Sequence, residues 1–440
     1  MKLTKSQLLL ISFMLFSLFF GAGNLIFPPL LGQQAASKSL FATIGFLITA
    51  VVLPILGVIV VGKFDGLTNL GNKVGKRFAL VFTLLIYLSI GPGLGIPRAG
   101  SVPFEMAITP ILPKNCNLTL WMFIYTSIFF AIVLWLCLTP GKLVKRIGTI
   151  LTPSLLGLIL ILFIVFLFKS PKVVNTPLNI YANNAFLQGF VDGYQTMDTI
   201  AALNFGLVMV ITLNNFGIKH KKDIIKYTIF SGIIAGIILA LVYIMLSVIG
   251  TYTSGFYPAD PNGALILRRI ASELFGEAGA FLIAGIFTLA CLTTCIGLTN
   301  SISQYFATFF KKVSYTKWVI IITILSFLIC NLGLNAILKI SIPILNAIYP
   351  VSIALIVLGL TDQYLKNNRF IYRLVIYSTF VISIINALEG LNINLGFITK
   401  ILSFIPLYNK GFGWVVVAIF MAILSIILNK IFPNKKLSRE

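Results

Sequence analysis

The sequence predicts an all-α polytopic membrane protein with about twelve transmembrane helices. Of its 440 residues, 58% are apolar and only 10% are charged, whereas a soluble domain has roughly 25% charged residues. Apolar runs recur along the whole chain, and each is about as long as a helix that crosses ~30 Å of hydrocarbon. Basic residues gather in alternate segments between these runs. One large water-soluble domain is therefore excluded.

Twelve segments are expected to span the membrane. In chain order they are 8–34, 40–62, 78–104, 118–138, 149–168, 184–214, 227–249, 277–308, 318–338, 340–361, 371–389 and 412–432. The gap at 250–276 is too polar to span, since it contains Pro258, Asp260, Pro261 and the pair Arg268 and Arg269. We expect an external loop with a short helix there.

The basic residues predict the orientation of the chain. Cytoplasmic loops retain Lys and Arg, and with a cytoplasmic N-terminus every second loop is basic along the whole sequence. The residues that then face the cytoplasm are Lys2, Lys5, Lys63, Lys73, Lys76, Arg77, Lys142, Lys145, Arg146, Lys219, Lys221, Lys222, Lys226, Lys311, Lys312, Lys317, Lys366, Arg369, Arg373, Lys430, Lys435, Lys436 and Arg439. An even number of spans places both termini in the cytoplasm, in a protein of the cell membrane.

Several function classes fit this sequence poorly. The net charge of +22 would suggest nucleic acid in a soluble protein, but no basic cluster has interleaved aromatic residues in a polar context. An enzyme needs a nucleophile–base pair or a metal cluster, and the single histidine, His220, lies in a Lys-rich loop. A channel would need a selectivity ring, and none is recognisable. We expect membrane lipid as a partner, no nucleic acid and no obligate protein partner.

The first span contains helix breakers at mid-depth. Its sequence at 21–29 reads GAGNLIFPP, in which the glycines and Asn24 weaken the helix and Pro28 removes a backbone hydrogen bond. The sixth span contains GFVDGYQTMD at 189–198, with two acids, a Gln, a Thr and two glycines. One reading of either segment is packing glycines with a kink. The other is a broken helix, which survives only where protein or a wet cavity satisfies the freed backbone groups.

Two broken helices together favour a transporter. Freed amides and the positive end of a helix dipole suit an anion, and freed carbonyls suit a cation, so a zwitterionic amino acid suits both. Spans one and six are five positions apart, which is the offset of a five-helix repeat, and a repeat with an odd number of spans inserts its second copy upside down. We therefore expect one transmembrane domain over 1–440, with inverted repeats at about 8–168 and 184–361 and two extra helices within 371–432.

The eighth span carries a candidate site for a monovalent cation. The carbonyl of Ala290 and the hydroxyls of Thr293 and Thr294 occupy positions i, i+3 and i+4, which share one helix face. Carbonyls around Ser17 and Phe20 in the first span could complete such a site. The alternative is that the Thr hydroxyls bond back to carbonyls one turn earlier.

Three ionisable residues within the spans are candidates for proton transfer or gating, because a charged side chain at membrane depth is costly and usually has a function. Asp198 would act as a proton site or as an acceptor that orients backbone amides. Arg98 and Glu105 flank the end of the third span, and the alternative is that both reach the outer interface.

These segments resemble a known family. The run at 21–29, the IPR segment at 96–98 with Glu105, and the GYQTMDT segment at 193–199 are together similar to the bacterial branched-chain amino acid:cation symporters, or system II carriers, of the amino acid–polyamine–cation superfamily. The resemblance covers nearly the whole chain. It implies the leucine-transporter-type fold, with two inverted five-helix repeats and two further helices, and transport of leucine, isoleucine and valine with Na⁺ or H⁺.

The resemblance also implies roles for particular residues. In that fold the amides of Ala22 and Gly23, followed by Asn24, hold the substrate carboxylate. A conserved sodium site takes the carbonyl of Ala290 and the hydroxyls of Thr293 and Thr294. The spacing from Asn24 to Pro28 differs by one residue from the best-known members, so contacts beyond Asn24 do not transfer.

The expected substrate pose follows from both lines of reasoning. The ammonium would meet carbonyls near Gly193 and Tyr194, with the Thr196 hydroxyl, and the branched side chain would lie near Tyr194 and Met197. The sequence alone does not identify the residues that line the pocket. A related symporter for another neutral amino acid or a nucleobase therefore remains the alternative, with an ion channel ranked lower.

Overall fold

The computed structural model describes residues 3–113, 115–139, 147–178, 180–258, 262–365, 368–391, 393 and 395–431, and this part of the chain is helical with no β-strand. Several residues named in the topology prediction lie outside the described residues: Lys2, Lys142, Lys145, Arg146, Asp260, Pro261, Lys366, Lys435, Lys436, Arg439 and the side chain of Lys430.

The α-helices follow one another with short connections. They are α1 Lys5–Phe19, α2 Ala22–Ala35, α3 Ser39–Leu47, α4 Leu53–Lys63, α5 Leu67–Gly71, α6 Lys76–Leu88, α7 Gly95–Pro103, α8 Leu118–Cys137, α10 Thr152–Lys169, α11 Tyr181–Asp192, α12 Asp198–Asn215, α13 Lys221–Thr253, α14 Gly263–Phe275, α15 Glu277–Phe309, α16 Tyr315–Cys330, α17 Leu334–Thr361, α18 Arg369–Gly390, α19 Phe397–Leu402 and α20 Gly413–Ile431.

Apart from α5, α14 and α19, which lie between predicted spans, these helices fall in order on the predicted spans. Eight helical stretches in the described residues are long and apolar enough to cross a membrane, or nine when the bent pair Tyr181–Thr196 and Asp198–Asn215 counts as one span. Three shorter apolar helices, Lys5–Phe19, Tyr315–Cys330 and Gly413–Asn429, occupy the first, ninth and twelfth predicted spans. The first long stretch, Ala22–Lys63, combines the second half of the first span with the whole second span. The polar gap contains α14, the short helix expected there.

The boundary between the ninth and tenth spans was predicted too late in the chain. α16 ends at Cys330 and α17 begins at Leu334, although the prediction continued the ninth span to residue 338. Gly333 has a positive φ of 88°, a conformation that side-chain-bearing residues rarely adopt. This short turn is followed at once by apolar residues, so hydropathy does not mark it.

Glycines allow close packing of the helices around the centre. A Cβ at Gly32 of α2 would lie 2.0 Å from the carbonyl oxygen of Ser247, and one at Gly250 of α13 would lie 1.9 Å from that of Pro29. The two helices therefore present a glycine to each other's backbone. Small residues at such contacts are typical of helix pairs in membranes, where close approach drives association.

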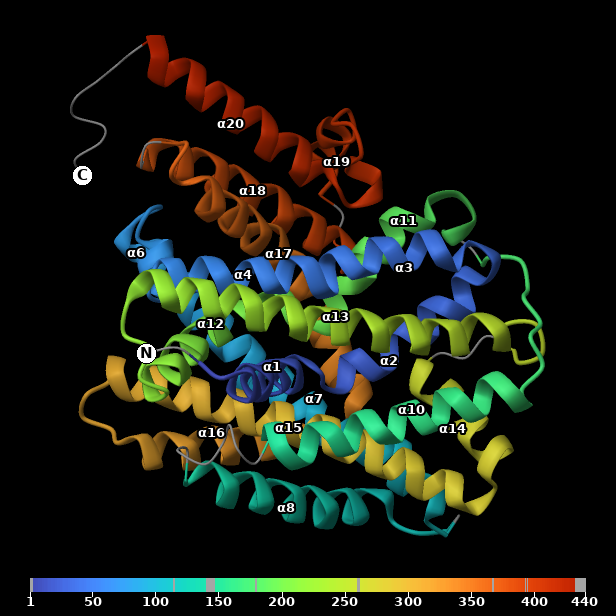
Figure 1. Cartoon of the computed structure of the whole chain (residues 1–440). Coiled ribbons are helices and arrows are strands. Elements are labelled where there is room, and N and C mark those ends of the chain that lie inside the picture. The colour runs from blue at the N-terminus through green and yellow to red at the C-terminus, as the bar shows by residue number, and fades with distance from the viewer. Residues whose placement is uncertain are drawn as a thin grey trace.

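The bundle has an interior and a lipid-like exterior. α1 and α2 lie in its middle, whereas α8 and α20 lie at opposite edges (Figure 1). The outer helices expose large apolar side chains, among them Phe123, Ile128, Trp135, Ile419 and Phe420. Such a surface suits hydrocarbon around the molecule, because in water it would carry a large hydrophobic penalty.

Candidate functional site

The first span is broken between α1 and α2. α1 ends at Phe19 and α2 begins at Ala22. The backbone of Gly21 is extended (φ −126°, ψ −153°), and its N–H donates to Oδ1 of Asn24 at 2.9 Å. The amides of Ala22 and Gly23 open α2, and within the described ranges neither has a hydrogen-bond partner. The predicted break is confirmed, and it leaves two amides free for a ligand.

The sixth span is also broken. α11 ends at Asp192, one 3₁₀ turn covers Gly193–Thr196, and α12 begins at Asp198. Met197 between them adopts the left-handed conformation (φ 68°, ψ 7°), which is uncommon for a residue other than glycine. The two parts of the span meet at a bend of 47°.

A cavity of about 30 Å³ lies between the two breaks. A cavity needs roughly 10–15 Å³ to hold one water molecule, so this one has room for about two. Its lining comes from both breaks and from the third and eighth spans: Leu18, Phe19, Gly21, Ala22, Gly23, Asn24, Ile90, Gly95, Arg98, Ala99, Thr196, Met197, Asp198, Ala201, Thr294 and Leu298. Of the predicted substrate residues, five border it.

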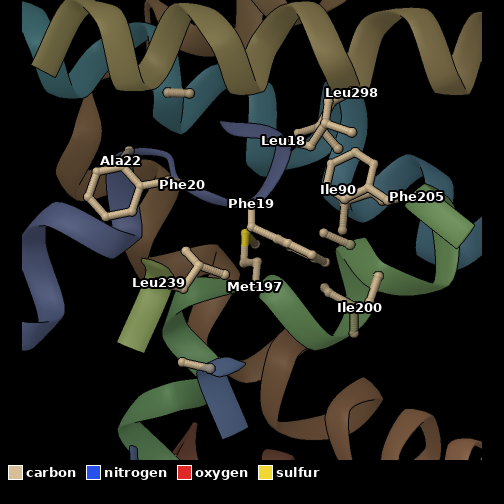
Figure 2. Close-up of a cluster of buried hydrophobic side chains, with 14 of the residues drawn as sticks. Leu18, Phe19, Phe20, Ala22, Ile90, Met197, Ile200, Phe205, Leu239 and Leu298 are labelled. Atoms are coloured by element: carbon tan, nitrogen blue, oxygen red, sulfur yellow. The ribbon is translucent and has the colours of Figure 1, made fainter. Parts of the chain in front are cut away.

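One side of the cavity is apolar. Figure 2 shows Phe19 extending from the end of α1 with Met197 beside it, and Ile90 and Leu298 on the neighbouring helices. The ring of Phe19 meets that of Phe205 edge to face, with centroids 5.4 Å apart. The other side carries two charged side chains, so the cavity is amphipathic.

Asp198 holds three helices together at the cavity. Its Oδ2 accepts from Nδ2 of Asn24 at 2.7 Å and from the hydroxyl of Tyr243 on α13 at 2.8 Å. Asn24 and the Tyr243 hydroxyl are hydrogen-bonded to each other as well. Asp198 is 1% exposed, and these donors offset the desolvation of a carboxylate that is otherwise unfavourable at this depth.

Arg98 reaches the cavity from the third span. Non-helical backbone at Gly91 (φ −86°, ψ −125°) separates α6 from α7 and tilts the segment that carries Arg98. Its Nη1 donates to the carbonyl of Gln195 at 2.8 Å and its Nη2 to that of Thr196 at 3.4 Å. Its Nε is buried without a partner in the described part of the chain. The guanidinium thus caps carbonyls that the second break sets free.

The candidate cation residues are partly assembled. The hydroxyl of Thr294 donates to the carbonyl of Ser17 on α1 at 3.3 Å. The hydroxyl of Thr293 donates to the carbonyl of Ala290 at 3.0 Å, which is the back-bonding that sequence reasoning left open. The carbonyl oxygen of Ser17 on α1 and the hydroxyl oxygen of Thr294 on α15 therefore lie together, and neutral oxygens of this kind fit Na⁺. The ring of Phe20, whose carbonyl is the other oxygen expected from the first span, stacks on that of Phe16 (5.1 Å between centroids).

Comparison with known proteins identifies the family. Residues 4–432 match the model of the family described as "Branched-chain amino acid transport protein". The chain belongs to this family. The chain is similar to the branched-chain amino acid permease BrnQ of Bacillus subtilis, with 36% identity over 99% of both chains. A putative branched-chain amino acid carrier protein of Staphylococcus haemolyticus is 39% identical over 97% of both chains. These relatives are named permeases and carriers rather than enzymes.

Solved structures show the same fold at low identity. A closed form of Mhp1, a nucleobase-cation-symport-1 family transporter with bromovinylhydantoin bound, superimposes with a TM-score of 0.55 at 13% identity and covers 98% of this chain and 94% of its own. MhsT in complex with L-phenylalanine gives a TM-score of 0.54 at 16% identity, with 95% of this chain and 97% of its own covered. This likeness confirms the predicted leucine-transporter-type fold. Membership in a transport family, together with the many apolar helices, makes the chain a multi-pass membrane protein.

Two predicted substrate residues and one predicted gating residue lie away from the cavity. Gly193 and Tyr194 do not line it, and their carbonyls accept from the hydroxyl of Thr196 (2.9 Å) and the amide of Met197 (3.1 Å). Glu105 lies in a separate, larger cavity of about 710 Å³, where its Oε1 accepts from the amide at the start of α17 at 2.9 Å. Arg98 and Glu105 therefore do not share a site.

Proposed function

We propose that this protein is a secondary symporter that moves leucine, isoleucine and valine across the cell membrane by alternating access, coupled to Na⁺ or H⁺. One observation carries the proposal: two broken spans face a single cavity that has an apolar side and a charged side. Membership in a branched-chain amino acid transport family supports the substrate class. The free amides of Ala22 and Gly23 at the start of α2 suit the substrate carboxylate.

The apolar side suits a branched aliphatic chain. Phe19, Ile90, Met197 and Leu298 offer contacts without polar groups that would demand a hydrogen bond. A pocket of this kind separates substrates that differ by one methylene by only ~1–3 kcal/mol. Leucine, isoleucine and valine should therefore compete with one another.

The position of the candidate cation site, between α1 and α15, suits the coupling of Na⁺ to substrate transport. A Na⁺ held by Thr293, Thr294 and the carbonyl of Ser17 would bridge α15 and α1, and it would bind differently to two orientations of these helices. Each charge that moves inward gains ~2.3 kcal/mol per 100 mV of membrane potential. The proposed architecture keeps the inverted repeats at about 8–168 and 184–361, with both termini in the cytoplasm.

Uptake into proteoliposomes tests this function. Labelled leucine is offered to purified protein under a Na⁺ gradient, under an H⁺ gradient and with no gradient, and a panel of amino acids and a nucleobase compete with it. We expect saturable accumulation that a Na⁺ gradient drives and that isoleucine and valine inhibit within about a hundredfold of leucine. Accumulation with an H⁺ gradient alone would assign the coupling to protons instead.

Two other results would overturn the proposal. Strong inhibition by a different neutral amino acid or by the nucleobase, with no effect of isoleucine or valine, would reject the substrate class. Flux that does not saturate and shows no counterflow of preloaded leucine would indicate a channel.

A further inference from the structure

Two opposite charges face the cavity without pairing. Arg98 and Asp198 both line it, and they are 3% and 1% exposed. Both side chains are described, yet no ion pair within 4.0 Å joins them. Charges at membrane depth are costly and almost always pair, so two that share a cavity and remain apart leave room for a ligand with both signs.

The positive end of the cavity is built from three groups. The Nη2 of Arg98 lies close to Gly23, because a Cβ on that glycine would be 2.8 Å from it. Gly23, whose amide is one of the two free amides at the start of α2, is therefore beside the guanidinium. The buried Nε–H of Arg98 is an unused hydrogen-bond donor in the described part of the chain. A guanidinium with adjacent helix N-terminal amides is a strong arrangement for a carboxylate.

The negative end is Asp198. The carbonyls at the second break are already engaged, since those of Gln195 and Thr196 accept from Arg98 and that of Tyr194 accepts from the amide of Met197. Each therefore keeps at most one lone pair for an ammonium. Asp198 is the one acidic side chain among the residues that line this cavity. An ammonium that enters it has this group as its natural partner.

We propose that Arg98 and Asp198 bind the two ends of the substrate, with the carboxylate on Arg98 and the amides of Ala22 and Gly23, and the ammonium on Asp198. This inference rests on the proposed function and names the residues that select an α-amino acid. The apolar side, beginning at Met197, then receives the side chain. A cavity with room for two water molecules is too small for an amino acid, so α2, α7 and α12 move apart as the substrate binds.

Binding of three ligands tests the charge assignment. Leucine, leucinamide (no carboxylate) and isocaproate (no amino group) displace labelled leucine from purified protein in nanodiscs. We expect wild type to prefer leucine over either analogue by at least about tenfold, the loss typical of one charge-assisted hydrogen bond. Arg98→Gln should remove the preference over leucinamide but not that over isocaproate. Asp198→Asn should remove the preference over isocaproate but not that over leucinamide.

Controls separate binding from folding. Arg373→Gln removes a guanidinium whose Nε donates to the carbonyl of Val74 at 3.0 Å, outside the cavity, so both preferences should stay as in wild type. Arg98→Lys keeps the charge and should retain the preference over leucinamide even if Arg98→Gln is too unstable to purify. Thermal unfolding of each variant reports its stability independently.

The outcomes distinguish this inference from the proposed function. If Arg98→Gln and Asp198→Asn weaken all three ligands in parallel, or if the two selectivities do not change, the charge assignment is wrong while leucine transport stands. If wild type binds another α-amino acid in place of leucine, the same variants tested with its amide and its deaminated analogue still decide the assignment. In that case the substrate class alone is wrong.

Discussion

At the scale of single residues, the two threonines of the eighth span are the most direct test of cation coupling. Thr294 contacts the carbonyl of Ser17, whereas Thr293 bonds within its own helix. Replacing either hydroxyl by a methyl group keeps the side-chain shape and removes one oxygen. We expect Thr294→Val to raise the Na⁺ concentration for half-maximal leucine uptake about tenfold, if one oxygen contributes ~1.4 kcal/mol.

Uptake measured against Na⁺ concentration checks this prediction. Thr361→Val is the matched control, because this hydroxyl bonds back to Val357 at 2.9 Å in α17 and takes no part in the proposed site. An unchanged Na⁺ dependence for both Thr293→Val and Thr294→Val would remove the site from the mechanism.

Sequence reasoning found the residues that differ from their surroundings. Asn24, Arg98 and Asp198 are polar residues in apolar spans, and the structure brings all three to one cavity. The sequence did not point to Tyr243, whose hydroxyl donates to Asp198 from 45 positions further along the chain. One Tyr among many aromatic residues carries no signal until the packing of α13 places its hydroxyl beside a buried carboxylate.

At the scale of helices, the packing of α2 on α13 supports the site. Asn24 and Tyr243 lie on these two helices and meet at Asp198, while Gly250 lets the backbones approach. We expect Gly250→Ala to separate the helices, since its Cβ would lie 1.9 Å from the carbonyl oxygen of Pro29 and a backbone atom cannot rotate away. Overpacking of this kind costs ~1–3 kcal/mol.

Two measurements follow for Gly250→Ala. Thermal unfolding should shift to lower temperature, and leucine binding should weaken because the Asn24–Tyr243–Asp198 contacts open. In the control Gly232→Ala on the same helix, the new Cβ meets only the Cγ2 methyl of the Ile55 side chain, at 3.1 Å, and this variant should change little. Equal behaviour of the two variants would mean that close approach at Gly250 does not hold the site.

Helix breaks were predictable and helix partners were not. Glycines, Pro28 and clustered polar residues disrupt hydrogen bonding locally, so both breaks could be located from the sequence. The choice of partner depends on shape complementarity between distant segments, such as the glycine contacts between α2 and α13. The turn at Gly333 was missed for a related reason, because a three-residue connection hardly changes the hydropathy of its surroundings.

At the scale of the whole molecule, the alternation of basic loops predicts which side each loop faces. α15 covers Glu277–Phe309, so the segments that flank it should lie on opposite sides of the membrane. Ser272 and Lys312 are exposed on these flanks, and four of the native cysteines are buried while Cys116 is half-buried. A Cys116→Ser background therefore allows single cysteines to be introduced and labelled.

A membrane-impermeant maleimide should label Ser272→Cys in intact cells and Lys312→Cys only in inside-out vesicles or after the membrane is opened. This result follows because Lys311, Lys312 and Lys317 lie after α15 and positive charge is retained in the cytoplasm. The reverse pattern would invert the orientation of the whole chain, including the proposed direction of the cation gradient. Labelling of both positions from the same side would show that α15 does not cross the membrane, and the pairing of the first and eighth spans at the cation site would then be lost.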